Sequence, residues 1–380
     1  MEIGHLQFTK VMEDKNVRTG SVKMNEKNKK VLKISLCILA GMIILCIAGF
    51  IGKNKFLHTT YTKLNDTDQK MLSEYNQLYE QISEEPLWKD FDLEDKSILA
   101  MSKDSLDAYL INPKKVPGNL LAQKIEMPKD FEMQSIYRIA PIVPQILTIR
   151  LNIGSNFSTI GNQYSVLGND VYYVKYDKET SFEKPNTSKH FAPFLAHEFF
   201  HYYMQNEWKL SKIPENELSK EDLDLLKEEY QILDNINAEL QSNKDHNRLN
   251  DYAKQYVEVV SKRIESNKEY VTSELSQETA EGTAQYLTIK TSKLVGYDYG
   301  IMYFDNVTNV PLLNIFNQIE AGNFGINYLY DQMPYQTGAS LCFLFDELEI
   351  PNWQEKLNSQ TLDKPVYLYD ILKEYVDKEA

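Results

Sequence analysis

The longest apolar stretch of the chain lies near its beginning. Residues 34–52 (ISLCILAGMIILCIAGFIG) carry no charge, and lysines stand at both ends of the stretch. A helix of this length spans about 28 Å, close to the thickness of the hydrocarbon core of a bilayer. The stretch starts later and runs longer than the apolar core of a secretory signal peptide, and no small-residue cleavage site follows it. We therefore predict one transmembrane helix over 34–52.

The charges around this stretch predict its orientation. Residues 1–33 contain eight basic and four acidic residues. Basic residues next to a membrane-spanning helix are retained in the cytoplasm. We therefore expect 1–33 to be a cytoplasmic basic tail and the rest of the chain to lie outside the cell. The protein is then a single-pass protein of the cell membrane, in contact with the lipid bilayer through 34–52.

The next region combines a helical pattern with several short apolar runs. Apolar residues at spacings of three, four and seven predict a helix within 59–85, and we assign 53–95 to a helical stalk or linker. Four runs rich in β-branched and aromatic residues then follow, separated by turn residues, and we predict them as strands. They are SILAM at 97–101, AYLIN at 108–112, ILTIRLNI at 146–153 and VYYVKYD at 171–177.

From Phe191 onward the pattern becomes helical for most of the chain. Apolar stripes at 219–240 and 247–268, joined by the polar stretch SNKDHN, predict a helical hairpin inserted at about 212–270. Such an insertion could pack only on itself or could shape a substrate site, and the pattern favours neither. Strands first and helices afterwards predict an α+β domain over 96–380, with a strand-rich lobe and a helical lobe.

Composition narrows the class of protein. The net charge of −14 and the pI near 5.0 argue against a nucleic-acid partner, because such proteins need a basic face. Two of the three cysteines lie inside the apolar stretch, which leaves Cys342 without a partner for an internal disulfide.

One short motif carries the candidate chemistry. The stretch FLAHEFFHYYMQ at 194–205 contains His197, Glu198 and His201 in the order H-E-x-x-H. Residues four apart lie on one face of a helix, so both imidazoles can bind one metal ion while Glu198 points toward a water on that ion. Two histidines and a glutamate among apolar neighbours are costly unless something neutralises them. The motif predicts a catalytic Zn²⁺ site, with one ion per chain.

A catalytic zinc site needs a third protein ligand and one open position. The stretch ELSQETAEGTAQYL at 274–287 offers Glu274, Glu278 and Glu281 on one predicted helix. Of the pair Glu278 and Glu281, one can bind the metal while the other orients a ligand imidazole. The small residue Gly282 would let this helix approach the H-E-x-x-H helix closely.

The motifs H-E-x-x-H and E-G-x-A-x-Y together resemble the gluzincin zinc peptidases, which include zinc aminopeptidases and bacterial collagenases. The resemblance covers roughly 165–345 and implies a zincin-like two-lobed catalytic domain with Glu281 as the third zinc ligand. A later stretch, Tyr330 to Gly338, is similar to the family's Tyr-x-x-x-Pro-Tyr-x-x-Gly motif. It implies that Tyr335 stabilises the oxyanion and that Tyr330 assists nearby.

The chain also departs from the aminopeptidases in this family. The predicted hairpin lengthens the gap between His201 and Glu281, and IGNQYSVLGN at 160–169 has no acid where aminopeptidases bind the free amine of their substrate. The strand at 171–177 could still be an edge strand that pairs with an extended peptide. Endopeptidase and exopeptidase activity both stay open.

Together with this resemblance, the residues predict a membrane-anchored zinc metallopeptidase, a hydrolase that acts on a peptide or protein substrate. Glu198 would take a proton from the attacking water, and Tyr335 would donate a hydrogen bond to the oxyanion. Two alternatives remain, because the motif specifies the metal and the water but not the bond that is cleaved. One is a membrane-anchored module that binds zinc for sensing or binding, and the other is a zinc hydrolase of a non-peptide amide.

Overall fold

The computed structural model describes residues 25–56, 59–118, 120–152, 155–185, 187–214, 218–304 and 307–379. The chain divides into two compact units at residue 50, and the described residues from 51 onward all belong to the second unit. Most of the predicted cytoplasmic tail, residues 1–24, lies outside the described residues.

Helix α1 (Glu26–Phe56) contains the predicted transmembrane stretch and extends beyond both of its ends. Its segment Glu26–Gly49 is long and apolar enough to cross a membrane, a property that a signal sequence near the N-terminus shares. The apolar side chains of this segment are exposed, and Leu45 reaches 74 %.

The strands of the second unit form a mixed seven-stranded sheet in the order β1-β4-β5-β3-β2-β7-β6, with β8 and β9 as a separate hairpin. The pairs β1/β4 and β2/β7 are parallel, and the remaining pairs in the large sheet are antiparallel. The strands are β1 (Thr59–Thr60), β2 (Ile98–Ser102), β3 (Ala108–Ile111), β4 (Ala122–Glu126), β5 (Ile136–Ile139), β6 (Tyr164–Val166), β7 (Asn169–Tyr176), β8 (Tyr303–Phe304) and β9 (Val307–Thr308).

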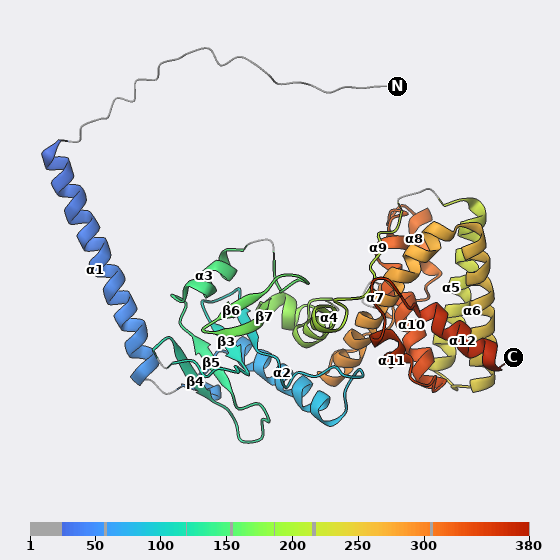
Figure 1. Ribbon diagram of the computed structural model, residues 1–380, viewed down its shortest axis with the longest axis horizontal. Coiled ribbons are helices and arrows are strands. Elements are labelled where there is room, and N and C mark those ends of the chain that lie inside the picture. Colours follow the sequence, from blue (N-terminus) through green and yellow to red (C-terminus); the bar gives the residue numbers. More distant parts are fainter. Residues whose placement is uncertain are drawn as a thin grey trace, which may run out of the picture. The chain divides into compact units, whose positions relative to one another are not determined.

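Helices account for most of the chain after Phe191, as the sequence predicts (Figure 1). Those of the second unit are α2 (Asp66–Glu84), α3 (Pro144–Leu151), α4 (Phe191–Met204), α5 (Lys220–Leu240), α6 (His246–Ser266), α7 (Lys268–Leu294), α8 (Asn314–Glu320), α9 (Tyr328–Asp331), α10 (Met333–Glu347), α11 (Trp353–Asn358) and α12 (Leu368–Glu379). Shorter helical turns lie at Tyr61–Lys63 and Glu179–Glu183. This arrangement is an α+β fold with a sheet-containing lobe and a helical lobe.

Strand β7 shows how the sheet separates two cores. Tyr172, Val174 and Tyr176 face the main core, whereas Val171 and Tyr173 face a smaller core on the other side. This alternation follows from the two-residue period of a strand. Helix α4 covers the first face, where the ring centroids of Tyr172 and Phe199 lie 5.3 Å apart.

The segment predicted as a stalk belongs to the main core instead. Met71, Tyr75 and Leu78 of α2 are fully buried there, and Asp68 accepts hydrogen bonds from the hydroxyls of two sheet tyrosines. The predicted boundary at residue 95 is therefore wrong, because the apolar stripe of α2 needs the sheet and α4 to bury it.

Residues 146–151 of the predicted strand at 146–153 belong to helix α3 instead, and residue 153 lies outside the described residues. Ile146 and Ile149 are buried in the smaller core, while Leu147 and Leu151 are exposed, which is a helical period. Pro144 occupies the first turn, where its fixed φ favours helix initiation. Packing on the sheet thus outweighs the β-propensity of the stretch.

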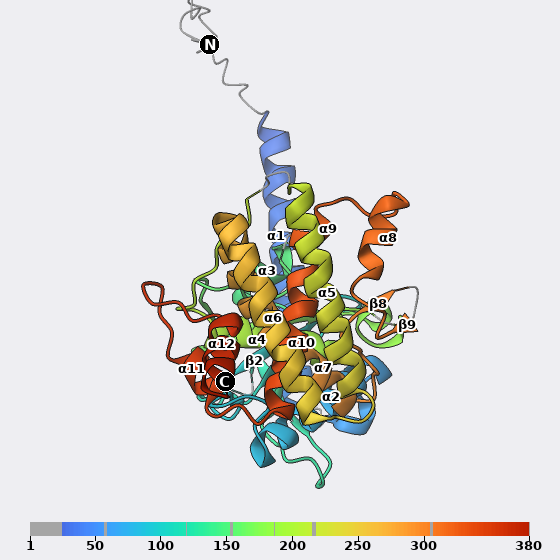
Figure 2. The ribbon, with the colours of Figure 1, turned by 90° about the vertical axis from the view of Figure 1, so that its right-hand side faces the viewer.

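The predicted helical hairpin is confirmed as α5 and α6, and it does not pack only on itself. Figure 2 shows α5, α6 and α10 side by side. The buried Arg263 of α6 bonds Glu229 of α5 at 2.5 Å and Glu274 of α7 at 2.6 Å. This ion-pair network connects the hairpin to α7, the helix that carries Glu281.

Helices α7 and α10 cross at two glycines. A Cβ atom added to Gly282 would overlap the backbone of Gly338, and one added to Gly338 would overlap the carbonyl of Glu278. Gly282 therefore allows a close approach to α10, and not to α4 as its position in the sequence suggested. The crossing brings Glu281 of α7 toward Tyr335 of α10.

We predict that Gly338→Ala lowers the free energy of unfolding by about 2 kcal/mol, because the added methyl group forces the two helices apart. Thermal or denaturant unfolding of the detergent-solubilised protein measures this loss. Gly118→Ala is the matched control, since its added Cβ would meet no atom within 4 Å. Equal stability of the two variants would contradict a tight helix crossing.

Candidate metal centre

Helix α4 presents two different faces. Phe191, Leu195 and Phe199 are buried in the main core. The side chains of His197 and His201 lie on another face and are 13 % and 18 % exposed. The apolar face thus anchors the helix, and the two imidazoles remain accessible from the opposite side.

Helix α7 brings Glu281 to these two histidines, as predicted. Its Oε2 lies 3.1 Å from Nε2 of His201 and 3.6 Å from Nε2 of His197. The two Nε2 atoms are 3.1 Å apart. Three potential ligand atoms from two helices therefore converge on one point, although 80 residues separate His201 from Glu281.

The outward nitrogen of His201 is held by Gln205, one helical turn further along α4. Nδ1 of His201 bonds Oε1 of Gln205, whose amide nitrogen donates to the carbonyl of Ala280 and to the hydroxyl of Thr283 on α7. Because the Oε1 atom can only accept, Nδ1 of His201 carries the proton. The lone pair of Nε2 then faces His197 and Glu281.

The outward nitrogen of His197 is held in the same way by α7. Nδ1 of His197 lies 3.0 Å from Oγ1 of Thr288, and this hydroxyl donates to the carbonyl of Ala284. The hydroxyl therefore accepts from Nδ1, which again leaves the Nε2 lone pair directed at the cluster. Hydrogen bonds of this kind are typical of histidines that bind metals.

Two imidazole lone pairs and a carboxylate at these distances repel one another unless a cation lies between them. Burial raises the pKa of Glu281, but its interactions with His197 and His201 outweigh burial and hold that pKa well below the usual range. Burial lowers the pKa of His201, yet the Glu281 carboxylate outweighs it and raises that pKa. In the absence of metal, a proton on His201 would supply the positive charge. A metal ion has to displace this proton, so its affinity should rise with pH.

The donor set fits a zinc ion. His₂Glu sets with one open position are common at catalytic zinc, and ligand atoms at about 2.0–2.2 Å from a tetrahedral ion lie roughly 3.3 Å from one another. The three separations here, 3.1, 3.1 and 3.6 Å, lie around that value. The three residues that could hold the metal are His197, His201 and Glu281.

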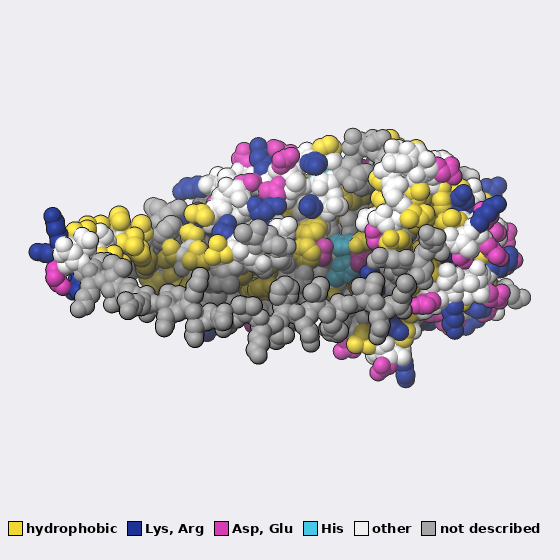
Figure 3. Space-filling view, turned by 90° about the horizontal axis from the view of Figure 1, so that it is seen from above, with side chains coloured by type: hydrophobic (Ala, Val, Ile, Leu, Met, Phe, Trp, Pro, Cys, Tyr) yellow, Lys and Arg dark blue, Asp and Glu magenta, His cyan; other side chains and the backbone are white. Residues whose placement is uncertain are grey.

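Glu198 and Tyr335 line one cavity beside this cluster. The cavity has a volume of about 470 Å³ and is also lined by His197. The rings of His197 and Tyr335 are parallel, with their centroids 5.9 Å apart. Figure 3 shows histidine side chains at the surface of the molecule, with acidic side chains beside them. The partial exposure of the His197 and His201 side chains leaves the centre accessible to solvent.

Burial controls the protonation of both residues. It raises the pKa of Glu198 to about 7, against the opposing effect of His201. It also raises the pKa of Tyr335 well above its ordinary value, to which the charge of Glu281 adds. Near neutral pH, Glu198 can thus accept or release a proton, while Tyr335 keeps its hydroxyl proton and can donate a hydrogen bond.

Two of the predicted helper residues lie elsewhere. Glu278 is buried, accepts hydrogen bonds from Tyr256 of α6, and makes no hydrogen bond with either histidine among the described contacts. Three residues of α7 correspond to a turn of about 300°, so the two side chains diverge by only about 60°. This difference is enough for Glu278 to contact Tyr256 of the hairpin while Glu281 contacts a histidine of α4. Tyr330 is not among the residues that line the cavity, whereas Tyr328 is.

The supporting residues Gln205 and Thr288 were not predicted from the sequence. Gln205 follows His201 by four residues, so it lies on the same face of α4 as that histidine. Thr288 follows Glu281 by seven residues, so it lies on the same face of α7 as that glutamate. These spacings could have indicated both residues, but spacing alone does not distinguish them from other polar residues on the same faces.

The strand predicted to pair with a substrate is an interior strand. The outer edge of β7 is covered by β6 at 169–171 and by the segment 156–158, which bonds Tyr173 and Lys175. Phe157 of this segment packs on Phe194, which lines the cavity, with ring centroids 5.3 Å apart. An extended peptide therefore cannot add to β7 itself.

We predict that Thr288→Val weakens zinc binding at least about tenfold, because it removes the acceptor that orients His197. Competition with a chromophoric chelator measures the affinity. Thr291→Val is the matched control, since Thr291 is also buried on α7 and its hydroxyl has no hydrogen-bond partner among the described residues. An unchanged affinity in Thr288→Val would mean that this hydrogen bond does not support the site.

The chain was compared with known proteins in three ways. No protein-family model, no curated protein and no solved structure matches it significantly. The chemistry of the centre is therefore inferred from its own geometry.

Proposed function

We propose that this protein is a membrane-anchored, zinc-dependent peptidase with a zincin-like catalytic domain of the gluzincin type. The main support is the convergence of His197, His201 and Glu281, with both imidazoles oriented so that their free lone pairs face the carboxylate. Glu198 adds to this support, because a site that only binds metal has no need of a carboxylate with a pKa of about 7 beside it.

Zinc bound to these three residues would supply a Lewis acid that polarises a carbonyl group and lowers the pKa of a water molecule. In the proposed mechanism Glu198 accepts a proton from the attacking water and later delivers it to the leaving amine. Tyr335 donates a hydrogen bond to the oxygen on which negative charge develops. Thr288 and Gln205 hold the imidazoles in position during these steps.

The lining of the cavity favours a peptide substrate. Gln285, Gln332 and Gln336 present amide groups, which can hydrogen-bond to peptide backbone, and Phe194 and Tyr328 present aromatic rings. The volume of about 470 Å³ lies within the range of pockets that bind small ligands or side chains.

Two variants test this function by separating metal binding from turnover. Glu198→Gln should retain zinc and abolish cleavage, because it removes the proton acceptor, and Tyr335→Phe should lower kcat about 100-fold, because it removes the oxyanion donor. Cleavage of a mixed peptide library, followed by mass spectrometry, measures turnover, and elemental analysis measures zinc. Tyr330→Phe is the control for Tyr335, since it lies outside the cavity lining.

The outcomes distinguish the alternatives. Full activity of Glu198→Gln would remove that residue from the mechanism. One zinc per chain with no cleavage of any peptide would favour the binding or sensing module, and cleavage confined to a non-peptide amide would favour the other hydrolase. If protein that has been supplied with excess metal contains no bound metal, the proposal as a whole is contradicted.

The proposal includes a single-pass topology, with the N-terminus in the cytoplasm and the catalytic domain outside the cell. It rests on the apolar segment in α1 and on the basic residues that precede it. Protease added to intact cells should then digest residues 59–380. Protection of this region in intact cells, together with digestion after lysis, would contradict the topology.

A further inference from the structure

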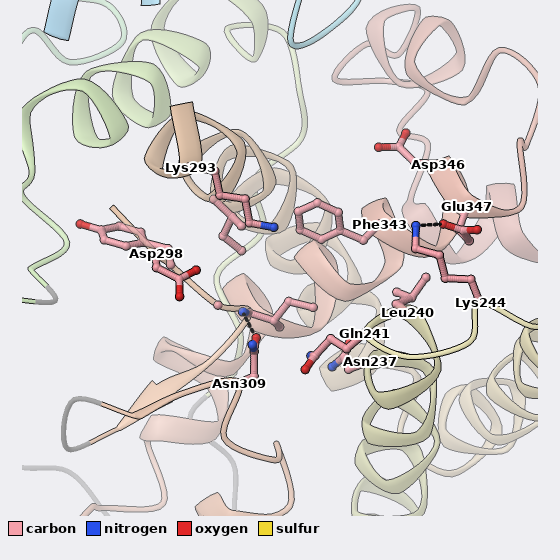
Figure 4. A pocket seen from close by; sticks show the side chains of 14 residues that line it. Asn237, Leu240, Gln241, Lys244, Lys293, Asp298, Asn309, Phe343, Asp346 and Glu347 are labelled. Carbon is pink, nitrogen blue, oxygen red and sulfur yellow. Dashed lines mark hydrogen bonds and ion pairs between the residues drawn. The ribbon is translucent and has the colours of Figure 1, made fainter. Parts of the chain in front are cut away.

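A second cavity lies away from the candidate metal ligands, between the C-terminal parts of α5, α7 and α10 and residues 298–301 and 309 (Figure 4). Its volume is about 460 Å³, and neither His197 nor Glu281 lines it. Tyr299 belongs to the walls of both this cavity and the one beside the metal centre.

Two opposite charges in this cavity lack an ion-pair partner. Lys293 extends from α7 over the ring of Phe343, with its Nζ atom 5.8 Å from the ring centroid. Neither Lys293 nor Asp298 forms a salt bridge with any residue that the structure describes. Lys244, another cation of the lining, is already paired with Glu347 at 2.5 Å. Lys293 and Asp298 are therefore free to bind a ligand that carries both charges.

The α5 side forms the buried wall of the cavity. Asn237 of α5 is only 9 % exposed, and its Oδ1 atom is shielded from solvent. This wall therefore closes the inner end of the cavity and leaves Lys293 and Asp298 as its unpaired charged groups among the described residues. Figure 4 shows Asn237 and Gln241 together on one side of the cavity and Lys293 on another.

Apolar side chains line the space between these polar groups. Leu240, Ile289, Ile301 and Phe343 contribute to the lining and come from all four parts of the wall. Small-molecule sites typically combine such an apolar lining with a few convergent polar groups. The lining is thus suited to a ligand with an apolar side chain as well as charged ends.

We propose that this cavity binds a short zwitterionic peptide of two or three residues. Its carboxylate would bind Lys293, its ammonium group would bind Asp298, and an apolar side chain would contact the apolar lining. A phosphate or nucleotide fits less well, because Asp298, Asp346 and Glu347 in the lining would repel several negative charges that only one unpaired lysine attracts. The proposal does not depend on the chemistry of the metal centre.

Isothermal titration calorimetry with the dipeptide leucyl-phenylalanine tests this site. The parent is the full-length, detergent-solubilised Glu198→Gln protein with its metal, which prevents hydrolysis of the probe should the centre be a peptidase. Lys293→Met and Asp298→Asn should each weaken binding about tenfold, the usual effect of losing a charged hydrogen bond. Lys254→Met, which changes an exposed lysine on α6, should bind like the parent.

Modified probes make the assignment specific. Amidation of the dipeptide's carboxylate should weaken its binding to the parent, but should not weaken its binding to Lys293→Met any further. Acetylation of the dipeptide's amine should likewise weaken its binding to the parent but not to Asp298→Asn. Binding that is equal in the parent and both variants would overturn the proposal, and so would an absence of binding at millimolar dipeptide. Peptidase activity without dipeptide binding, or binding without activity, would separate this site from the proposed catalytic function.

Discussion

The position of helix α7 depends on close contacts with two other helices, α10 and α4. Both contacts involve the turn of α7 that contains Glu281. On one side Gly282 lies against Gly338 of α10, at a distance that no side chain larger than hydrogen would permit. On the other side Gln205 of α4 donates hydrogen bonds to Ala280 and Thr283. Because Glu281 stands between these contacts, its carboxylate is placed with little freedom. The close packing of α7 on α10 thus explains why glycine occupies position 282 in the E-G stretch and position 338 in the Y-x-x-G stretch.

The bonds that hold α4 against α7 also orient the imidazoles. Gln205 and Thr288 each engage one histidine and the backbone or a side chain of α7. The same hydrogen bonds therefore pack α4 against α7 and orient the two imidazoles toward the position of a cation. A centre of this kind keeps its ligand atoms close together at an electrostatic cost, which a proton on His201 or a metal ion offsets.

Acidic residues on α7 serve two separate purposes. Glu274 forms part of the buried network around Arg263 and joins the helical hairpin to the core. Glu278 faces the same side, and burial raises its pKa to about 8, with the Glu229 charge adding to the effect. Glu281 alone of the three turns toward α4. The hairpin is thus part of the support for the helix that carries the candidate ligand.

The sequence by itself determined the features that depend on local spacing. The apolar run before residue 53 follows from its length and its lack of charge. The placement of His197, Glu198 and His201 on one helix and the α5–α6 hairpin follow from a period of 3.6 residues. The resemblance to a family further singled out Glu281 and Tyr335, and the structure brings both to the histidines.

Only the tertiary structure decided which polar residues orient the ligand histidines and that Glu278 is not one of them. It also made residues 146–151 part of a helix, buried α2 in the core, covered the outer edge of β7 with other segments and formed the second cavity. The physical reason is the same in each case. Burial, hydrogen-bond partners and edge exposure depend on segments far apart in the chain, and local periodicity contains no information about which segments will meet.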